Sequence, residues 1–155
     1  MNRRALAFGI AAVAFGVNVV VERALLKVAT GFAIIPGLVD FTPAFNHGVS
    51  FSLFTQSTPS GRLMLMGVLT VISAAVAVMA WRATTSLSAA AFGLVLGGAL
   101  GNLADRWVYN GGVFDFLWLH LGRTSLFICN GSDIFISAGV VLLLLDGFLT
   151  KPRST

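Results

Sequence analysis

Charged residues are scarce in this chain of 155 residues, where they make up 10% of the sequence. Ordinary soluble domains carry about 25%. Hydrophobic residues make up 57%, and the mean hydropathy is +0.91. This composition excludes a disordered chain, because such chains are polar, and it excludes an ordinary soluble domain. The sequence therefore predicts a membrane protein.

Cysteine and histidine are nearly absent as well. Cys129 is the only cysteine, which excludes a disulfide framework within one copy, and neither His47 nor His120 lies in a helical HExxH motif. We therefore expect no metal site. Cys129 is interpreted as a small buried residue, because the sequence places neither histidine to activate it as a nucleophile.

The sequence also lacks a basic stripe. The net charge of +4 comes from ten Lys and Arg against six Asp and Glu, dispersed singly or in pairs along the chain. A nucleic-acid-binding surface would need basic residues clustered on one face. We therefore expect no nucleic-acid partner, and we interpret the positive charge as an orientation signal and as contact with anionic lipid head groups.

Long stretches without charge give the expected architecture. A bilayer core about 30 Å thick is crossed by roughly 20 helical residues. Four stretches fit this length, of which the last has one ionisable residue, Asp133: Ala5–Val21, Leu63–Trp81, Ser86–Ala104 and Thr124–Leu145. They predict an all-α membrane protein, a bundle of four transmembrane helices at about 5–26, 62–81, 86–104 and 126–149. We expect a single integral-membrane domain over residues 1–155, with outer-face loops at about 27–61 and 105–125.

The positions of the basic residues predict the topology. Basic residues are enriched on the cytoplasmic side of membrane proteins. Arg3 and Arg4 precede the first stretch, Arg82 lies between the second and third, and Lys151 and Arg153 follow the fourth. These places are therefore predicted to be cytoplasmic, with both termini inside and the two long loops outside.

The first outer loop has the pattern of short strands. Pro36-Gly37 marks a turn, and apolar and polar residues alternate over much of Phe32–Phe54. Such an element would lie on the bilayer surface, where its edge could accept a peptide by strand addition. A simple packed cap over the helix ends is an equally good interpretation.

Glycines recur at every fourth position of the third stretch, at Gly93, Gly97 and Gly101. This spacing places them on one helix face, where a neighbouring backbone can approach closely. We interpret them as a packing face rather than as part of a functional site.

Ionisable residues in or beside membrane helices are costly, so each is a functional candidate. Asp133 lies about six residues inside the predicted fourth helix, and Asp115 lies in an apolar part of the second outer loop. If the two carboxyl groups meet in a partly dry site, they share a proton and can perform aspartic-protease chemistry. Their spacing in sequence also permits two separate, unrelated carboxylates.

Other polar residues near these aspartates have simpler interpretations. Asp105 and Arg106 are interpreted as an ion pair at a helix end that fixes the following loop. Asn102 and Asn130 could donate amide hydrogen bonds to a buried polar cluster or to a substrate backbone. A separate set at the outer end of the first helix is interpreted as charges that extend to the membrane interface: Glu22, Arg23 and Lys27.

Taken together, these residues resemble the lipoprotein signal peptidase family, signal peptidase II, the bacterial membrane aspartic peptidases. Four motifs occur in the order of the family. The segment IPGLVDFTPAFNHGVSFSLF resembles the one that carries N-x-G-A-A-F, and LVLGGALGNLADR matches G-G-A-x-G-N-x-x-D-R. VFDF matches V-V-D-F, and CNGSD resembles F-N-x-A-D. The resemblance spans most of the chain, from about Ile35 to Asp146.

The resemblance implies a function and a set of site residues. It implies an enzyme of the bacterial inner membrane that removes signal peptides from prolipoproteins, on the amino side of a diacylglyceryl-modified cysteine, with no cofactor. The active site would lie at the periplasmic face beside the strand-containing element, in contact with membrane lipids, and could take globomycin-like inhibitors. The catalytic aspartates fall on Asp115 and Asp133, and the supporting residues fall on Asn46, Gly48, Asn102, Asp105, Arg106 and Asn130.

Departures from the family pattern mark a divergent member. When the first-helix motif D-Q-x-[ST]-K is aligned on Lys27, Arg23 stands in place of the Asp and Glu22 is its neighbour. Val49-Ser50 replaces Ala-Ala, and Cys129 and Ser132 replace Phe and Ala. The alternative function is therefore a noncatalytic relative that binds lipidated peptides or acts as a membrane assembly partner.

Overall fold

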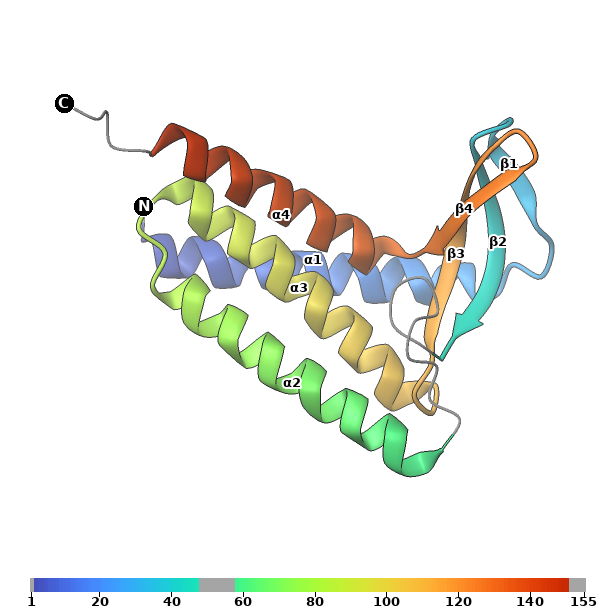
Figure 1. Ribbon diagram of the computed structural model, residues 1–155, viewed down its shortest axis with the longest axis horizontal. Helices are drawn as coiled ribbons and strands as arrows, with labels where there is room; N and C mark the ends of the chain where they lie inside the picture. Colours follow the sequence, from blue (N-terminus) through green and yellow to red (C-terminus); the bar gives the residue numbers. More distant parts are fainter. Residues whose placement is uncertain (1, 48–57, 151–155) are drawn as a thin grey trace.

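Four long helices form a bundle in the computed structural model, which describes residues 2–47 and 58–150 (Figure 1). The helices are α1 (Arg3–Leu25), α2 (Pro59–Trp81), α3 (Ser86–Val108) and α4 (Gly131–Leu149). Each is long and apolar enough to cross a membrane. The first residues of α1 and the last residues of α4 lie at the same end of the bundle, as the topology requires.

The helix ends differ from the predicted ones where polar caps decide them. Thr85 and Asn130 form capping boxes at the starts of α3 and α4, in which each side chain accepts a hydrogen bond from a backbone N–H of the first turn. The fourth helix therefore begins at Gly131, and the start predicted near residue 126 is wrong. At its other end, α3 continues to Val108, beyond the predicted residue 104.

A four-stranded antiparallel sheet lies across one end of the bundle, so the all-α class is inexact (Figure 1). Its strands are β1 (Phe32–Ile35), β2 (Val39–Asn46), β3 (Val113–Leu121) and β4 (Thr124–Cys129), in that order. The strands predicted in the first loop are confirmed up to Asn46, and the rest of that prediction lies outside the described residues. The second loop was not predicted to form strands.

The physical reason for these further strands is visible in the turns around β3. Before β3, Gly111 has a φ of +93°, and between β3 and β4 Gly122 has a φ of +57°, both in the left-handed region that favours glycine. The nine residues between these turns are mainly β-branched, aromatic or leucine, which suit a half-buried strand. The hairpin therefore forms from what hydropathy alone marks as an apolar loop.

Helix α3 is the centre of the bundle and packs against the other three helices. A Cβ atom on Gly93 would lie 2.5 Å from the carbonyl oxygen of Ala7, and one on Gly97 would lie 2.7 Å from that of Ala11. A Cβ on Gly98 would likewise collide with the backbone of Ser132 in α4. The predicted glycine packing face is confirmed, and it lets α1 and α4 approach α3 closely.

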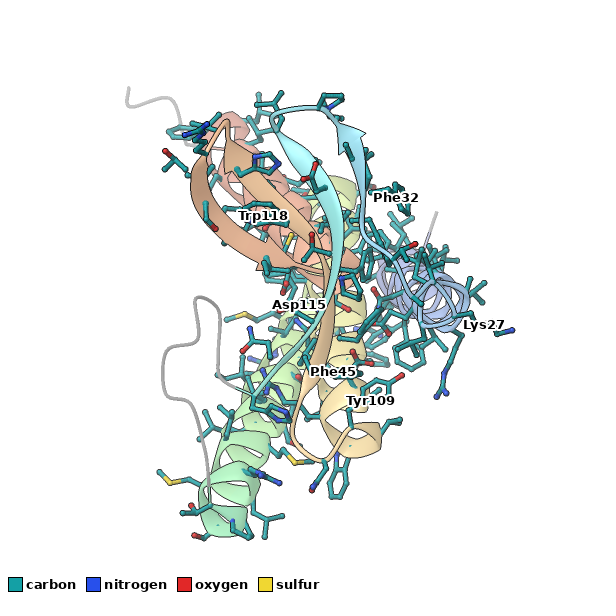
Figure 2. The ribbon with its side chains drawn as sticks, turned by 90° about the vertical axis from the view of Figure 1, so that its right-hand side faces the viewer. Lys27, Phe32, Phe45, Tyr109, Asp115 and Trp118 are labelled. Carbon is teal, nitrogen blue, oxygen red and sulfur yellow. The ribbon has the colours of Figure 1, made fainter. Side chains whose placement is uncertain are left out.

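The sheet is fixed to the bundle by an aromatic core. Phe41 of β2 packs with Phe114 and Phe116 of β3, and all three are buried against the end of α1. Figure 2 views the molecule from the sheet end and shows Asp115 between Trp118 on one side and Phe45 and Tyr109 on the other. This packing fixes the position of β3, and with it Asp115, above the ends of the helices.

Candidate active site

Asp115 faces away from the aromatic core because side chains alternate along a strand. Its neighbours Phe114 and Phe116 belong to the buried cluster, whereas Asp115 lines a pocket on the opposite face. The carboxylate is 3% exposed. The strand therefore holds a carboxyl group in a largely desolvated position above the helix ends.

Asp133 lies in the first turn of α4, nearer to the helix end than the sequence predicted. Its backbone N–H donates to Oδ1 of Asn130 at 3.1 Å, and its Oδ2 accepts from the backbone N–H of Asn130 at 3.3 Å. A helix N-terminus carries a partial positive charge that favours an ionised carboxylate. The local structure thus stabilises the negative charge of Asp133.

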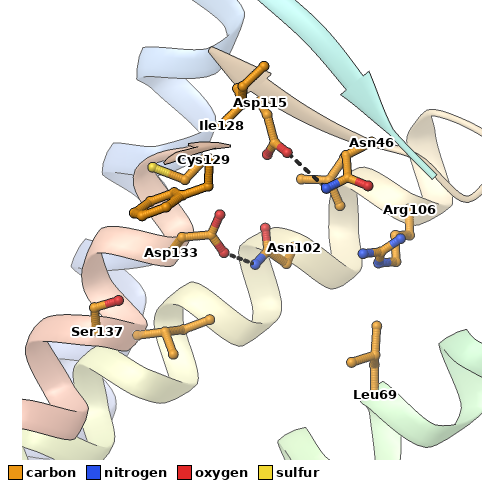
Figure 3. A pocket seen from close by; sticks show the side chains of 12 residues that line it. Asn46, Leu69, Asn102, Arg106, Asp115, Ile128, Cys129, Asp133 and Ser137 are labelled. Carbon is orange, nitrogen blue, oxygen red and sulfur yellow. Dashed lines mark hydrogen bonds between the residues drawn. The ribbon is translucent and has the colours of Figure 1, made fainter. Parts of the chain in front are cut away.

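Asn130 and Asn102 connect the two aspartates, and Asn46 bonds to Asp115; Figure 3 shows the bonds that Asn46 and Asn102 donate. The Nδ2 group of Asn130 donates to Oδ1 of Asp115 at 2.9 Å and to Oδ1 of Asn102 at 3.0 Å. Asn102 in turn donates to Oδ1 of Asp133 at 3.0 Å, and Asn46 donates to Oδ2 of Asp115 at 3.1 Å. Five residues that the sequence singled out therefore form one hydrogen-bonded network, drawn from β2, α3, β3 and α4.

Beside this network lies a pocket of about 340 Å³. Its polar wall contains both aspartates, and its apolar wall comes from α2, β4 and α4 (Figure 3). The lining residues are Asn46, Leu69, Asn102, Arg106, Val113, Asp115, Phe127, Ile128, Cys129, Asp133, Ile136 and Ser137. A peptide group could thus contact apolar surface and two carboxyl groups at the same time.

The electrostatics of the pocket separate Asp115 from an ordinary surface aspartate. The pKa of Asp115 is raised to about 6, chiefly by burial and also by the charge of Asp133, although hydrogen bonds from Asn46 and Asn130 and the charge of Arg106 offset part of this rise. Burial and the two nearby aspartates also raise the pKa of the Cys129 thiol to about 11. Cys129 therefore remains a neutral thiol near neutral pH, in accord with its interpretation as a small buried residue.

Asp105 and Arg106 both fix the segment between α3 and β3, through its backbone. Oδ2 of Asp105 accepts from the N–H of Phe114 at 3.1 Å, and Nη1 of Arg106 donates to the carbonyl oxygen of Gly111 at 2.9 Å. Arg106 also lines the pocket. Of the remaining supporting residues, Gly48 lies outside the described part of the chain.

Sequence reasoning misinterpreted Glu22, which was assigned to the membrane interface but is 3% exposed. The buried residues of α1 are spaced three or four apart and form one stripe: Ala7, Ala11, Ala14, Asn18 and Glu22. This helical periodicity was the available signal, since it continues the face of small residues that packs against α3.

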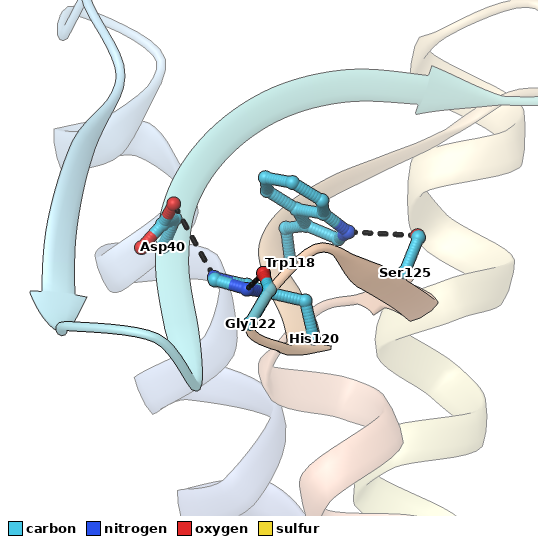
Figure 4. A network of polar contacts seen from close by, with 5 residues as sticks. All are labelled: Asp40, Trp118, His120, Gly122 and Ser125. Atoms are coloured by element: carbon cyan, nitrogen blue, oxygen red, sulfur yellow. Dashed lines mark hydrogen bonds and ion pairs between the residues drawn. The ribbon is translucent and has the colours of Figure 1, made fainter.

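A second polar cluster lies at the far end of β3 (Figure 4). Nδ1 of His120 lies 2.9 Å from the carbonyl oxygen of Gly122, and Nε2 lies 3.4 Å from Oδ2 of Asp40. The ring of Trp118 stacks on the imidazole at 4.3 Å, and its indole N–H donates to Ser125 at 2.8 Å. The imidazole of His120 is thus enclosed by groups of the sheet, with Nδ1 beside the carbonyl oxygen of Gly122 and Nε2 beside the carboxylate of Asp40.

Comparison with solved structures identifies the fold. Two bacterial membrane enzymes, solved by the in meso method at 1.9 and 2.3 Å resolution, have TM-scores of 0.75 and 0.71 with this chain. Their sequences are 21% and 22% identical to it, and the matches cover 94% and 96% of this chain and 94% and 93% of theirs. The chain therefore has the fold of a bacterial membrane enzyme.

Sequence comparisons identify the family. Residues 7–149 match the family model described as signal peptidase (SPase) II. The chain is 44% identical over 117 residues to a lipoprotein signal peptidase of Methylorubrum extorquens and 41% identical over 106 residues to one of Beijerinckia indica. These matches cover 74% and 68% of this chain, and 67% and 63% of the two relatives. The chain belongs to the signal peptidase II family, which confirms the resemblance seen in its motifs.

Proposed function

We propose that this chain is a lipoprotein signal peptidase that cleaves prolipoproteins by aspartic-peptidase chemistry. The observation that carries the proposal is the shared pocket of Asp115 and Asp133, two carboxyl groups from different elements bridged by Asn130. A water molecule between two such carboxyl groups can be activated by one of them while the other donates a proton. Family membership supports the same activity.

The environments of the two aspartates assign their roles. We assign the acid to Asp115, which holds a proton more readily than an ordinary aspartate because burial and the charge of Asp133 raise its pKa to about 6. Asp133 is the ionised member, because the N-terminus of α4 and the backbone N–H of Asn130 stabilise its negative charge. Asp133 removes a proton from water as the oxygen attacks the peptide carbonyl, and Asp115 donates its proton to the leaving amine nitrogen.

The surrounding polar residues hold this arrangement in place. Asn46, Asn102 and Asn130 fix the orientation of the carboxylates, and Arg106 contributes a positive charge and fixes the turn before β3. Such preorganisation matters because donors that are already oriented need not reorganise during the reaction. Gly48 is assigned to the substrate side of the site by its place in the family motif alone.

The substrate is a prolipoprotein that carries a diacylglyceryl-modified cysteine, and cleavage takes place on the amino side of that residue. Its acyl chains remain in the bilayer and the peptide enters sideways between the helices, because the pocket opens beside apolar side chains of α2 and α4. Globomycin-like inhibitors would compete for the same pocket. The chemistry assigned to the two aspartates needs no cofactor.

The opposite end of the bundle supports the proposed orientation. Arg3, Arg4 and Arg82 surround a hollow there, and the guanidinium of Arg4 lies 4.2 Å from the ring centre of Trp81. Tryptophan and arginine are typical of the membrane interface, and arginine is enriched on the cytoplasmic side. We therefore place this end at the cytoplasm and the aspartates at the periplasmic face of the bacterial inner membrane, within a single domain.

The free-energy cost of holding two carboxyl groups in the pocket disfavours the noncatalytic alternative. Holding two carboxyl groups together in a desolvated pocket is unfavourable, and proteins keep such arrangements mainly where they serve catalysis. A protein that only binds lipidated peptides gains nothing evident from a desolvated Asp115 beside the charge of Asp133.

Cleavage of a diacylglyceryl-modified lipobox peptide by the purified protein in lipid tests the proposal. Asp115→Asn and Asp133→Asn should each reduce the rate by roughly 1,000-fold while the protein stays folded, since each removes one partner of the acid–base pair. Asp146→Asn is the matched control, because Asp146 accepts a hydrogen bond from Thr85 at the cytoplasmic end. If the native chain bound several lipobox peptides but cut none of them, the noncatalytic function would replace this one.

A further inference from the structure

Glu22 is a carboxyl group buried at the end of a membrane helix without a role in the mechanism above. It is 3% exposed and lies in the last turn of α1, on the face that packs against α3. Asn18, one turn earlier on this face, is 2% exposed and approaches Gly131, where an added Cβ would lie 2.6 Å from its Oδ1. Glu22 thus continues a polar path between α1 and the elements that carry the aspartates.

The partner of Glu22 is a second buried carboxyl group. Its side chain lies within reach of a hydrogen bond with that of Asp105, which is 6% exposed in the last turn of α3. Two carboxylates cannot form such a bond, because an ionised carboxylate only accepts hydrogen bonds. One member of the pair must therefore carry a proton.

Asp105 is the ionised member. Its Oδ2 accepts a hydrogen bond from the N–H of Phe114 at 3.1 Å, and the positive charge of Arg106 favours its negative form. The proton therefore belongs to Glu22, whose carboxyl group is desolvated and has no comparable backbone donor among the described contacts. Glu22 donates and Asp105 accepts.

This pair leads directly to the candidate catalytic group. Phe114 precedes Asp115 in β3, so the bond from its N–H to Asp105 fixes the strand one residue before the reacting carboxyl group. On the basis of the proposed function, we propose that Glu22 is a positioning residue for Asp115, whose protonated carboxyl holds Asp105 in the orientation that anchors the start of β3.

The proposal accounts for the departure in the first-helix motif. Arg23, which falls on the aspartate of the family motif, is exposed, whereas the neighbouring Glu22 is buried against α3. Glu22 lies on the buried stripe of α1 that also holds Asn18, so its carboxyl group faces α3, whereas position 23 is exposed. The carboxyl group missing from the motif is thus supplied by its neighbour.

Infrared spectroscopy of the full-length protein in lipid tests the shared proton without requiring cleavage. The Asp115→Asn, Asp133→Asn double variant removes the signals of the aspartate pair. In this background, a carboxylic acid carbonyl band should be present at neutral pH, should remain after Asp146→Asn and should disappear after Glu22→Gln. A band that is absent, or that survives Glu22→Gln, overturns the proposal.

The pH dependence of melting gives a second readout. The groups around Glu22 are Asp105, Arg106 and Tyr109, with Arg23 on its own helix. Alkaline pH removes the shared proton and leaves two buried carboxylates that repel, so the native protein should melt earlier there. Glutamine donates through its amide at any pH, so Glu22→Gln should reduce this alkaline shift, and an equal shift in both proteins overturns the proposal.

The kinetics of cleavage test whether the Glu22–Asp105 pair positions Asp115. Glu22→Gln keeps a donor to Asp105 and should cleave close to the native rate. Glu22→Leu removes the donor and should reduce kcat by roughly 10- to 100-fold with KM nearly unchanged, because Asp115 is displaced while the rest of the pocket remains. An effect on KM alone, or equal losses in both variants, contradicts the role. If the native chain cuts no peptide, the proposed function fails, whereas the infrared and melting results still decide the pair.

Discussion

The two ends of β3 carry similar polar groups in different surroundings. At one end, Asp115 accepts one hydrogen bond on each carboxylate oxygen and faces a pocket of about 340 Å³. At the other end, Nδ1 of His120 lies 2.9 Å from the carbonyl oxygen of Gly122, Nε2 lies 3.4 Å from the carboxylate of Asp40, and the ring of Trp118 stacks on the imidazole. The two residues are 3% and 6% exposed, so burial does not distinguish them.

Asp115 and His120 differ in the hydrogen bonds that they can still form and in the open space beside them. A carboxylate oxygen can accept about two hydrogen bonds, so Asp115 can still bind water or substrate on both oxygens. The imidazole of His120 is enclosed by Gly122, Asp40 and the stacked ring of Trp118, and it does not line this pocket. A buried polar side chain is thus a candidate for chemistry when it retains bonding capacity beside a space for substrate.

Asn130→Ala tests the Asp115 end and should give the largest effect. Asn130 is fully buried, bridges Asp115 to Asn102, and caps α4 beside Asp133. Its loss leaves Oδ1 of Asp115 without this donor and breaks the link from Asp115 to Asn102, so the cleavage rate should fall by roughly 100-fold or more. The loss of the helix cap should also lower the free energy of unfolding by about 1 kcal/mol. Both are measured on protein purified in lipid.

Thr85→Ala is the matched control, because it removes the capping box of α3 at the opposite end of the bundle. It should lower stability by a similar amount and leave cleavage unchanged. Equal losses of activity in both variants would mean that Asn130 acts only through helix stability. The proposal that Asn130 orients Asp115 for catalysis would then be wrong.

The pH dependence of stability and rate gives the next largest effect. Because the pKa of Asp115 is raised to about 6 from an ordinary 3.8, its protonated form stabilises the folded state below pH 4. This contribution, up to about 3 kcal/mol, is lost as the pH rises from about 4 to 6. Asp115→Asn should therefore flatten the melting curve against pH over this window.

The pH dependence of the cleavage rate should follow the titration of Asp115. If Asp115 is the acid, the rate should decline as the pH rises above about 6, because the protonated fraction then falls. Asp133→Asn removes a charge that raises this pKa, so the pKa of Asp115 should move down in that variant. Isotope-edited infrared titration measures it directly, and an unchanged value would show that the two carboxyl groups do not interact.

Much of this architecture could be predicted from the sequence. Uncharged stretches indicate where helices cross the membrane, since length and hydropathy are local properties of the chain. The motif order places Asp115, Asp133 and Asn130 on successive segments, and the structure brings them into one network. That meeting depends on the β3–β4 hairpin, which returns the chain to the start of α4.

The remaining features required tertiary information. The hairpin was predicted as a loop because its strands are too apolar to show alternation, and the fourth helix was predicted too early because β4 is as hydrophobic as a membrane helix. Glu22 was misassigned because a charged residue at a helix end is usually drawn to water. Only its buried contact with Asp105 on another helix reverses that expectation.

Asn46→Ala is a smaller test of the same end. Asn46 donates to Oδ2 of Asp115 and so stabilises its ionised form. Without this donor, the pKa of Asp115 should rise, and the alkaline decline of cleavage should move to higher pH. The rate at neutral pH should change only modestly, since Asn130 still orients the carboxyl group. A shift toward lower pH would contradict the assignment of Asp115 as the acid.

Asp40→Asn tests the His120 end and should give the smallest effect. Its carboxylate is 3.4 Å from His120 with 26% of the side chain exposed, and such ion pairs contribute about 0–1 kcal/mol. The melting temperature should fall slightly, and kcat and KM should stay at native values, although the same substitution at Asp115 should reduce cleavage by roughly 1,000-fold. Asp40 of β2 pairs with Trp118 of β3, and the same two strands pair at Ala44 and Asp115 beyond a register shift. A large kinetic effect of Asp40→Asn would therefore mean that the strand transmits strain from one end to the other, and that the His120 cluster positions the pocket.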